Sequence, residues 1–241
     1  MLSVKFIFHS KKESLEARKQ LFVFHFGVVA MTLLRRLLPG IFSGGEVDAP
    51  TWLDEDSPWS ILDRESERGL IEQIRSIPGS KDGIFIHHSA TIGKFVEIEG
   101  PCYIGPYAVI RHSAFIREGS WICGGSLVGH SSEIKNSILL PGAKAPHFNY
   151  VGDSILGSDV NLGAGTKLSN VRNDEGIISV RLIGESGDVK VNTGLRKFGA
   201  ILGDGARIGC NVVVNPGTII EPCSMINPNL SISGYISSGN E

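Results

Sequence analysis

Aliphatic residues recur at every sixth position over long stretches of the chain from residue 86 to residue 232. A period of six fits neither the 3.6-residue repeat of an α-helix nor the two-residue alternation of a strand. It is typical of hexapeptide repeats, in which each unit forms a short strand and a turn of a parallel β-helix. Each aliphatic side chain then points inward and stacks on its counterpart in the next coil. The positions in this period are Ile86, Ile92, Ile98, Ile104, Ile110, Ile116, Ile122, Val128, Ile134 and Leu140, then Tyr150, Leu156, Leu162 and Leu168, then Leu202, Ile208, Val214, Ile220, Ile226 and Ile232.

Two interruptions break the period. Ten residues instead of six separate Leu140 from Tyr150, so we expect a four-residue insertion that pushes a loop out of the coil. The second interruption runs from Leu168 to Leu202, and its alternating residues predict a β-hairpin insertion near residues 171–197. Because a regular solenoid has flat faces, we expect chemistry at such excursions or between subunits.

The first 83 residues lack the repeat, and we expect a helical and linker region there, followed by a solenoid domain over residues 84–241. Residues 57–79 carry an apolar side with helical spacing and predict a helix. The acidic stretch from Gly40 to Pro58 contains two prolines and has the character of a linker.

The apolar run from Leu21 to Leu34 is shorter than the roughly 20 residues that a membrane span requires, which argues against a membrane protein. Three interpretations of residues 1–30 stay open: an extended start with Met31 as the true initiator, an amphipathic helix, or a targeting segment.

Composition changes the picture in three ways. The net charge of −2 supplies no basic field for nucleic acid. The 30 glycines fit a chain with many tight turns. The four cysteines are widely spaced and form no zinc-binding pattern, so we expect no metal site.

The stretch KAPHFNYVGDSILGSDVNLGAGTKLSN, residues 144–170, has the form H-x-x-Y-x-G-D…N-x-G-A-G-T…N. It resembles the acetyltransferase half of the bifunctional N-acetylglucosamine-1-phosphate uridyltransferase/glucosamine-1-phosphate acetyltransferase family. The likeness covers roughly residues 84–235, and the expanded segment after Asn170 is similar to the archaeal-type branch. The resemblance implies a left-handed coil, a homotrimer with acyl sites between subunits, and a cytoplasmic enzyme that serves cell-envelope amino-sugar synthesis.

The family's uridyltransferase half is longer than the first 83 residues and opens with a glycine-rich G-x-G-T-R-M segment. No such segment occurs in this chain, so we expect no uridyltransferase activity.

The resemblance assigns His147 as the general base that takes a proton from the sugar amine. An imidazole with a pKa near 6.5 can accept that proton at neutral pH. Five other residues match positions that bind the amino sugar or its phosphate: Tyr150, Asn161, Arg117, Lys135 and Lys197.

Four residues match positions that contact acetyl-CoA, the expected co-substrate: Ala164, Asn170, Cys210 and Pro228. This side departs from the family. Val171 replaces an aromatic residue, Cys210 and Pro228 replace serine and alanine, and the chain ends at Glu241, before a family arginine that helps to hold CoA.

The sequence therefore predicts an acetyl-CoA-dependent N-acetyltransferase for glucosamine-1-phosphate or a related amino-sugar phosphate, with no metal required. Two alternatives stay open. One is the same chemistry with another acyl donor or sugar. The other is a non-enzymatic sugar-phosphate-binding or scaffold homologue, which the altered CoA side favours.

Overall fold

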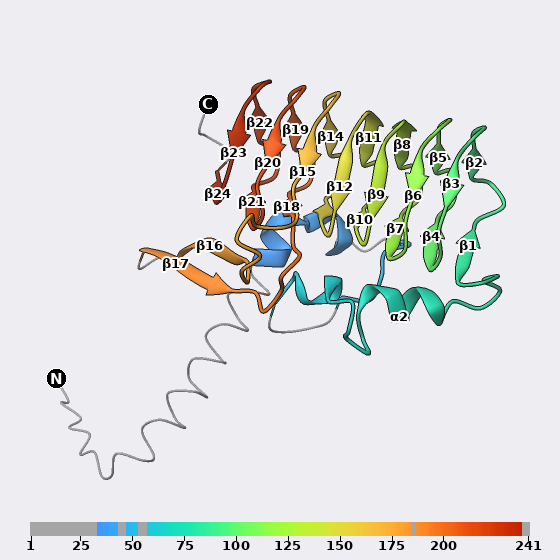
Figure 1. The fold of residues 1–241 in the computed structure, drawn as a ribbon, viewed down its shortest axis with the longest axis horizontal. Helices are drawn as coiled ribbons and strands as arrows, with labels where there is room; N and C mark the ends of the chain where they lie inside the picture. The colour runs from blue at the N-terminus through green and yellow to red at the C-terminus, as the bar shows by residue number, and fades with distance from the viewer. Residues whose placement is uncertain (1–32, 43–46, 53–56, 185–186, 238–241) are drawn as a thin grey trace, which may run out of the picture.

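In the computed structural model, residues 33–42, 47–52, 57–184 and 187–237 are described. The interpretations of residues 1–30 lie outside these ranges. The described chain forms a three-sided solenoid of parallel strands, about eight coils long, with two additions on one side (Figure 1). None of the helices within these residues is long and apolar enough to cross a membrane.

Three parallel sheets form the sides of the solenoid. Sheet A contains β1 (Ile84–Ile86), β4 (Cys102–Ile104), β7 (Ser120–Ile122), β10 (Ile138–Leu139), β13 (Ile155–Leu156), β18 (Ala200–Leu202), β21 (Thr218–Ile220) and β24 (Tyr235–Ile236). Sheet B contains β2 (Thr91–Ile92), β5 (Val109–Ile110), β8 (Leu127–His130), β11 (Lys144–His147), β14 (Asn161–Leu162), β19 (Arg207–Ile208) and β22 (Met225–Ile226). Sheet C contains β3 (Glu97–Ile98), β6 (Phe115–Ile116), β9 (Glu133–Lys135), β12 (Tyr150–Gly152), β15 (Lys167–Leu168), β20 (Val213–Val214) and β23 (Ser231–Ile232).

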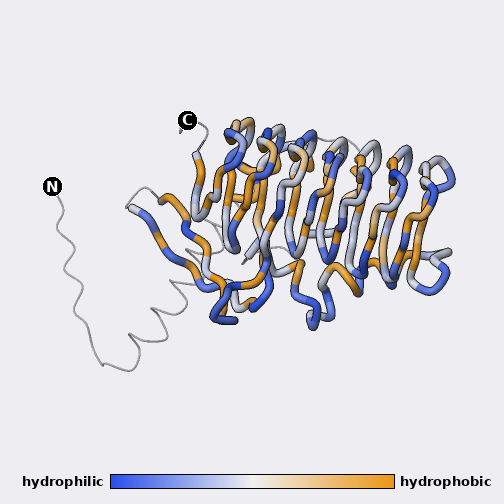
Figure 2. Tube along the Cα trace, turned by 45° about the horizontal axis from the view of Figure 1, so that its top comes forward, coloured by the Kyte–Doolittle hydropathy of each residue, from blue (hydrophilic) through white to orange (hydrophobic). Residues whose placement is uncertain are grey.

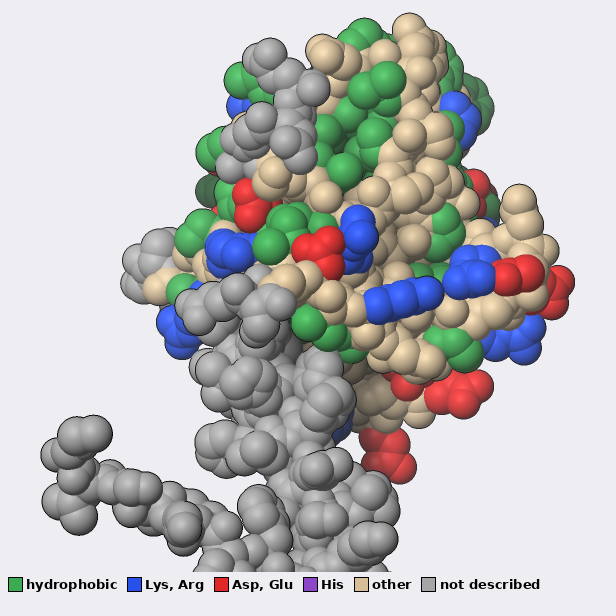
Figure 3. Space-filling model, turned by 90° about the vertical axis from the view of Figure 1, so that its left-hand side faces the viewer, with side chains coloured by type: hydrophobic (Ala, Val, Ile, Leu, Met, Phe, Trp, Pro, Cys, Tyr) green, Lys and Arg blue, Asp and Glu red, His purple; other side chains and the backbone are tan. Residues whose placement is uncertain are grey.

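The predicted fold class, a mainly β hexapeptide-repeat solenoid with an N-terminal helical segment and an extruded hairpin, is confirmed. Most of the short strands contribute one or two side chains to the core, where equivalent positions of successive coils stack at the strand spacing of about 4.8 Å. Figure 2 shows the hydrophobic segments that recur in every coil. Figure 3 shows hydrophobic side chains at the C-terminal end of the solenoid, where the described chain adds no further coil to cover the stack.

The first interruption of the repeat differs from the prediction. Ile122, Leu139 and Leu156 are Cα partners in successive coils, so each of these two coils has 17 residues rather than 18. The core positions are Leu139, Ala145 and Val151, and the residues predicted for the stack, Leu140 and Tyr150, do not belong to it. The expected four-residue insertion is therefore wrong. The phase changes because one residue is missing where sheet C turns into sheet A, and again one coil later.

The predicted helix over residues 57–79 is much shorter in the structure. It contains the 3₁₀ helix η2 (Ser60–Leu62) and the helix α2 (Leu70–Arg75), because Asp63 already has an extended ψ of 115°. Another 3₁₀ helix, η1 (Pro39–Phe42), lies earlier in the chain.

The N-terminal segment, defined as described residues 33–77, packs on the outer face of sheet A. Tyr103, Trp121, Ile138 and Ile155 supply part of that face. The segment is also tied by hydrogen bonds, although part of it had the sequence character of a linker. The Asp48 carboxylate accepts from Gly124 N at 2.8 Å, and the Asp48 carbonyl accepts from Trp121 Nε1 at 2.7 Å. Both faces of sheet A are consequently buried.

The second interruption forms the hairpin β16 (Ser179–Gly184) and β17 (Gly187–Asn192), which lies within the predicted 171–197 insertion. The hairpin and the residue before it bury Ile178, Val180 and Leu182 against the outer face of sheet A, to which Ile219 of β21 belongs. The hairpin leaves the coil and packs back onto it, on the same side as the N-terminal segment (Figure 1).

Candidate active site on two corners of the solenoid

His147 ends strand β11, at the corner where sheet B turns into sheet C (the B–C corner). Its Cα partner is His130 in the preceding coil, so it lies in the regular ladder and not on an inserted loop. The side chain is exposed, and its imidazole forms no hydrogen bond among the described residues. The backbone is fixed, because His147 N donates to Asn149 Oδ1 and His147 O accepts from Gly165 N, both at 3.0 Å.

Three of the four predicted CoA contacts continue from His147 along the same corner. Asn211 N donates to Ala164 O at 2.8 Å, and Asn229 N donates to Cys210 O at 2.9 Å, so each backbone turn is bonded to the one before. With about 4.8 Å between coils, the column spans roughly 15 Å along the solenoid. Ala164 N forms no backbone hydrogen bond in the described part of the chain and is free to donate. In coil order, the B–C column contains His147, Ala164, Cys210 and Pro228.

The predicted phosphate-binding residues gather elsewhere, where sheet C turns into sheet A (the C–A corner). Lys135 ends β9, and its side chain is nearly buried, with a residue exposure of 8%. Burial lowers the pKa of Lys135; the charge of Asp153 opposes this, and the nearby charges of Lys197, Arg117 and Arg64 lower the pKa further. Four cations therefore influence one another at this corner.

Arg117 lies at this corner but already has anionic partners. Its guanidinium donates to Glu133 Oε1 at 2.9 Å, and its Nε lies 3.6 Å from Glu99 Oε2. The hydrogen bond to Glu133 and the charges of Glu118, Glu133 and Glu99 raise the pKa of Arg117, although burial acts in the opposite direction.

Asp153 is the centre of a buried hydrogen-bond network at the C–A corner and is only 1% exposed. Its Oδ1 accepts from Asn136 Nδ2 at 2.7 Å, and its Oδ2 accepts from Asn170 Nδ2. Asn170 Oδ1 in turn accepts from the Tyr150 hydroxyl at 3.4 Å. Asp153 thus fixes the amide of Asn170, and through it the tyrosine. Burial raises the pKa of Tyr150, and the charges of Asp153 and Glu133 add to this.

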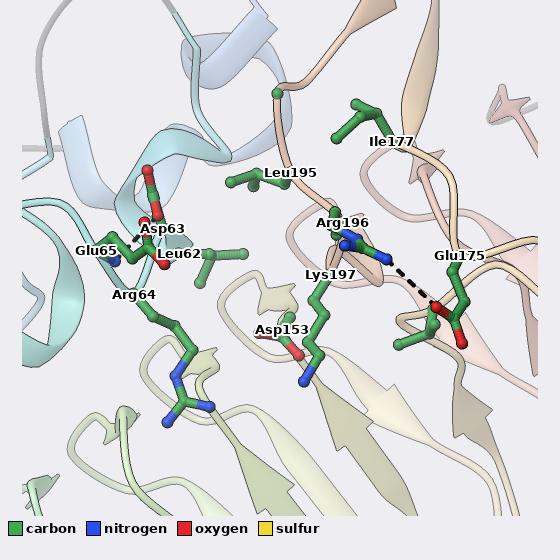
Figure 4. Close-up of a pocket in the computed structure, with 12 residues that line it drawn as sticks. Leu62, Asp63, Arg64, Glu65, Asp153, Glu175, Ile177, Leu195, Arg196 and Lys197 are labelled. Atoms are coloured by element: carbon green, nitrogen blue, oxygen red, sulfur yellow. Dashed lines mark hydrogen bonds and ion pairs between the residues drawn. The ribbon is translucent and has the colours of Figure 1, made fainter.

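Beside this network is a cleft of about 700 Å³ between the N-terminal segment and the base of the hairpin. Asp153, Arg64 and Lys197 line it together with the apolar residues Leu62 and Leu195. Figure 4 shows Arg64 and Lys197 reaching from opposite sides toward the region of Asp153. Lys197 has no ion-pair partner within the described chain, whereas its neighbour Arg196 pairs with Glu175 at 3.3 Å.

The structure therefore divides the predicted site into three parts. His147, Ala164, Cys210 and Pro228 share the B–C corner, whereas Arg117, Lys135, Asn170 and Lys197 belong to the C–A corner. Tyr150 begins β12 on sheet C, and its hydroxyl reaches Asn170 at the C–A corner. Asn161 belongs to neither corner: it begins strand β14 on sheet B, in register between Lys144 and Arg207. Asn170, expected on the CoA side, lies instead with the residues expected to bind sugar phosphate.

Sequence reasoning did not single out Asp153 and Arg64. Asp153 is the aspartate of the Y-x-G-D motif, so the signal was present but was not assigned a role. Arg64 lies outside the repeat, and only the packing of the N-terminal segment brings it to the cleft. No group of three or more His, Cys, Asp or Glu side chains suited to a metal ion occurs among the residues described.

Comparisons with known proteins show which family the sequence belongs to. The profile of the GMPPB C-terminal domain matches residues 98–227. A bifunctional sugar-1-phosphate nucleotidylyltransferase/acetyltransferase of Sulfurisphaera tokodaii is 33% identical over 197 residues, covering 78% of this chain and 48% of that protein. The bifunctional protein GlmU of Methanococcus vannielii is 35% identical over 190 residues, covering 74% of this chain and 43% of that protein.

The chain thus spans about half the length of these curated relatives. Among solved structures, the acetyltransferase domain of PglB from Neisseria gonorrhoeae, in complex with acetyl coenzyme A, aligns with a TM-score of 0.27 and 15% identity, covering 67% of this chain and 54% of that one. The profile covers more than half of the chain, and the relatives have the bifunctional character that the resemblance predicted. The chain belongs to the GMPPB C-terminal domain family, and proteins named bifunctional GlmU and sugar-1-phosphate nucleotidylyltransferase/acetyltransferase are among its homologues.

Proposed function

We propose that the protein is an acetyl-CoA-dependent N-acetyltransferase that acts on glucosamine-1-phosphate or a closely related amino-sugar phosphate. The observation that carries this proposal is the B–C column, in which the candidate base His147 is followed by Ala164, Cys210 and Pro228 in successive coils. Its length of roughly 15 Å suits an extended pantetheine arm lying along the solenoid. The names of the relatives, which include acetyltransferase, support the same chemistry.

In the proposed reaction, the amine of the sugar attacks the thioester carbonyl carbon. His147 takes the proton that the amine loses as the C–N bond forms. The free N–H of Ala164 is the candidate donor to the oxyanion, because the N–H of Gly165 already bonds to His147 O. The C–S bond then breaks, and the departing thiolate takes up the proton to give free CoA. The step needs no metal and no redox change.

The phosphate of the acceptor belongs at the C–A corner. Lys135 and Lys197 are the proposed first contacts, because neither has an ion-pair partner in the described chain. Arg117 would have to exchange Glu133 for the phosphate. Tyr150 and Asn170 are proposed sugar contacts, held in orientation by Asp153.

The two half-sites lie on different corners of one chain, with sheet C between them. We therefore propose a homotrimer in which the C–A corner of one subunit faces the B–C corner of its neighbour. We also retain the proposals of a cytoplasmic enzyme, of a role in cell-envelope amino-sugar synthesis and of no uridyltransferase activity.

The test is the release of CoA thiol when protein, acetyl-CoA and glucosamine-1-phosphate are mixed. His147→Ala should reduce kcat by roughly 10²- to 10⁴-fold, the usual effect of losing a general base. His112→Ala is the matched control, because His112 is exposed and stacks on His130 at 4.2 Å near the same corner. Undiminished release by His147→Ala would overturn the assignment of the base. A panel of amino sugars separates this acceptor from others, and binding of sugar phosphate without binding of CoA would favour the scaffold alternative.

A further inference from the structure

Arg64 is the one guanidinium that the segment before the solenoid contributes to the lining of the cleft beside Asp153. Its position is set by buried neighbours. Leu62, two residues earlier, is 2% exposed, and its carbonyl accepts from Asn136 Nδ2 at 2.8 Å. Trp59 packs against Phe198, the residue after Lys197, with 6.1 Å between ring centroids. The segment that carries Arg64 is therefore anchored both to the C–A corner and to the base of Lys197.

Arg64 still has donors to offer. Its Nη2 contacts Glu118 Oε1, and this is its single ion pair in the described chain. A guanidinium has five N–H donors in a planar fork that matches phosphate oxygens. Arg117, in contrast, lies within 4.0 Å of three carboxylates, those of Glu99, Glu118 and Glu133.

The lining of the cleft contains carboxylates as well as cations: Asp63, Glu65, Asp153 and Glu175 lie with Arg64, Arg196 and Lys197, and Glu175 already pairs with Arg196. Positive charge gathers at the edge of the cleft, near Lys135. Burial lowers the pKa of Lys135, the charge of Asp153 raises it, and the charges of Lys197, Arg117 and Arg64 lower it further. Lys135 and Lys197 have no ion-pair partner in the part of the chain that is described.

Holding several cations close together is unfavourable. Glu118 and the other carboxylates around Arg117 offset this cost for the two guanidinium groups, and Asp153 offsets part of it for Lys135. A phosphate monoester beside Lys135 and Lys197 would relieve the repulsion between these two amines.

We propose that Arg64 binds the phosphate group of the acceptor together with Lys135 and Lys197, so that the N-terminal segment completes the acceptor site and contributes to selection of phosphorylated amino sugars. The inference rests on the proposed function, and it adds a residue that lies outside the family motif. Glu118 then holds Arg64 in place while the cleft is empty and shares it with the phosphate when the cleft is filled.

Steady-state kinetics with glucosamine-1-phosphate and with unphosphorylated glucosamine test the inference. Arg64→Met should raise KM for glucosamine-1-phosphate by roughly 10- to 100-fold, the effect of losing one or two charge-assisted hydrogen bonds. KM for acetyl-CoA and turnover of glucosamine should not change. Arg64→Lys should recover part of the loss. Arg75→Met is the matched control, because Arg75 lies in the same segment and pairs only with Glu72 in the described structure.

Glu118→Gln separates ligand binding from a merely structural role. If the Arg64–Glu118 pair only holds the segment in place, Arg64→Met and Glu118→Gln should lower the free energy of unfolding to the same extent. If Arg64 binds phosphate, Glu118→Gln should leave KM for glucosamine-1-phosphate unchanged or lower it. An unchanged KM in Arg64→Met, or an equal loss with both acceptors, would overturn the inference.

Calorimetry with inorganic phosphate distinguishes this inference from the proposed function. If the wild-type protein releases no CoA but binds phosphate, and Arg64→Met does not bind it, the anion site stands and the acetyl-transfer proposal fails. If the wild-type protein binds neither inorganic phosphate nor glucosamine-1-phosphate, the anion site itself is wrong.

Discussion

The two corners that carry the candidate site differ in how far one chain completes them. At the C–A corner, Asp153, Asn136 and Asn170 are buried and hydrogen-bonded, and the N-terminal segment closes over them. At the B–C corner, His147, Cys210 and Pro228 are exposed, and the imidazole of His147 has no hydrogen-bond partner among the described residues. The comparison teaches that one chain can order the polar side chains of one corner completely and leave those of the other corner open. Under the proposed function, the acceptor side would thus be preorganised within one subunit, and the acyl-transfer side would be completed by the co-substrate or by a second subunit.

The largest effect should come from removing the contact that joins the N-terminal segment to the C–A corner. Phe198 is fully buried and packs against Trp59. Phe198→Ala should lower the free energy of unfolding by about 3–5 kcal/mol, because a large buried ring leaves a cavity. Chemical denaturation measures this change. A loss below about 1 kcal/mol would mean that the segment is not held at this corner.

A smaller effect is expected from the buried carboxylate. In Asp153→Asn, an NH₂ group takes the place of one carboxylate oxygen. This NH₂ group then faces the amide NH₂ of Asn136 or Asn170, and neither group can accept a hydrogen bond from the other. The free energy of unfolding should fall by about 1–3 kcal/mol, the cost of an unsatisfied buried polar group. His147→Ala, at the open corner, should change it by less than about 0.5 kcal/mol. Equal losses in the two variants would remove the distinction between the corners.

The smallest effect is a pH dependence. The pKa of Lys135 is lowered in the folded protein, first by burial, whereas the unfolded chain has the ordinary value of about 10.5. Between these two values the unfolded state binds more protons, so the free energy of unfolding should rise with pH in that window. Below the pKa that Lys135 has in the folded protein, its amine is protonated in both the folded and the unfolded state. The full cost of burying that charge then lowers the free energy of unfolding. Denaturation curves in this pH range should be flatter for Lys135→Met than for wild type.

Bound phosphate should sharpen this result. An anion beside Lys135 stabilises the protonated amine, so phosphate should raise the pKa of Lys135 in the folded protein and narrow the window from its lower side. The same titration at saturating inorganic phosphate provides the measurement. An unchanged window would place the anion away from Lys135.

Periodicity was sufficient to predict the solenoid, because side chains that stack coil upon coil require a fixed spacing. It failed at Leu139 and Leu140. Sheet A is buried on both faces, so adjacent residues of its strands are both apolar, as in Ile138–Leu139 and Ile155–Leu156. Hydrophobicity alone then cannot tell which residue points inward. The shift by one position created an apparent loop around His147 that the structure does not contain.

The candidate site was partly predictable for a related reason. Residues on one corner keep a fixed relation to the repeat, so His147, Ala164, Cys210 and Pro228, which the motif resemblance selected, lie in one column. Arg64 could not be found in this way, since its position depends on how Trp59 and Leu62 pack. The role predicted for Asn161 stays a prediction; the structure places it at the start of β14 on sheet B, away from both corners.

The coils change length at the C–A corner alone. Core positions are six residues apart from Ile86 to Ile134, but Ile134 to Leu139 and Val151 to Leu156 are five apart, and the hairpin separates Leu168 from Leu202. The other two corners never vary in the paired coils from Ile86 to Ile232. Additions and deletions at this single position leave the inward stack in register on all three faces. The C–A corner is thus the position where this chain gains or loses residues without rebuilding its core. If the proposed acceptor site lies there, a loop grafted between Leu168 and Leu202 would be the starting point for engineering a new acceptor.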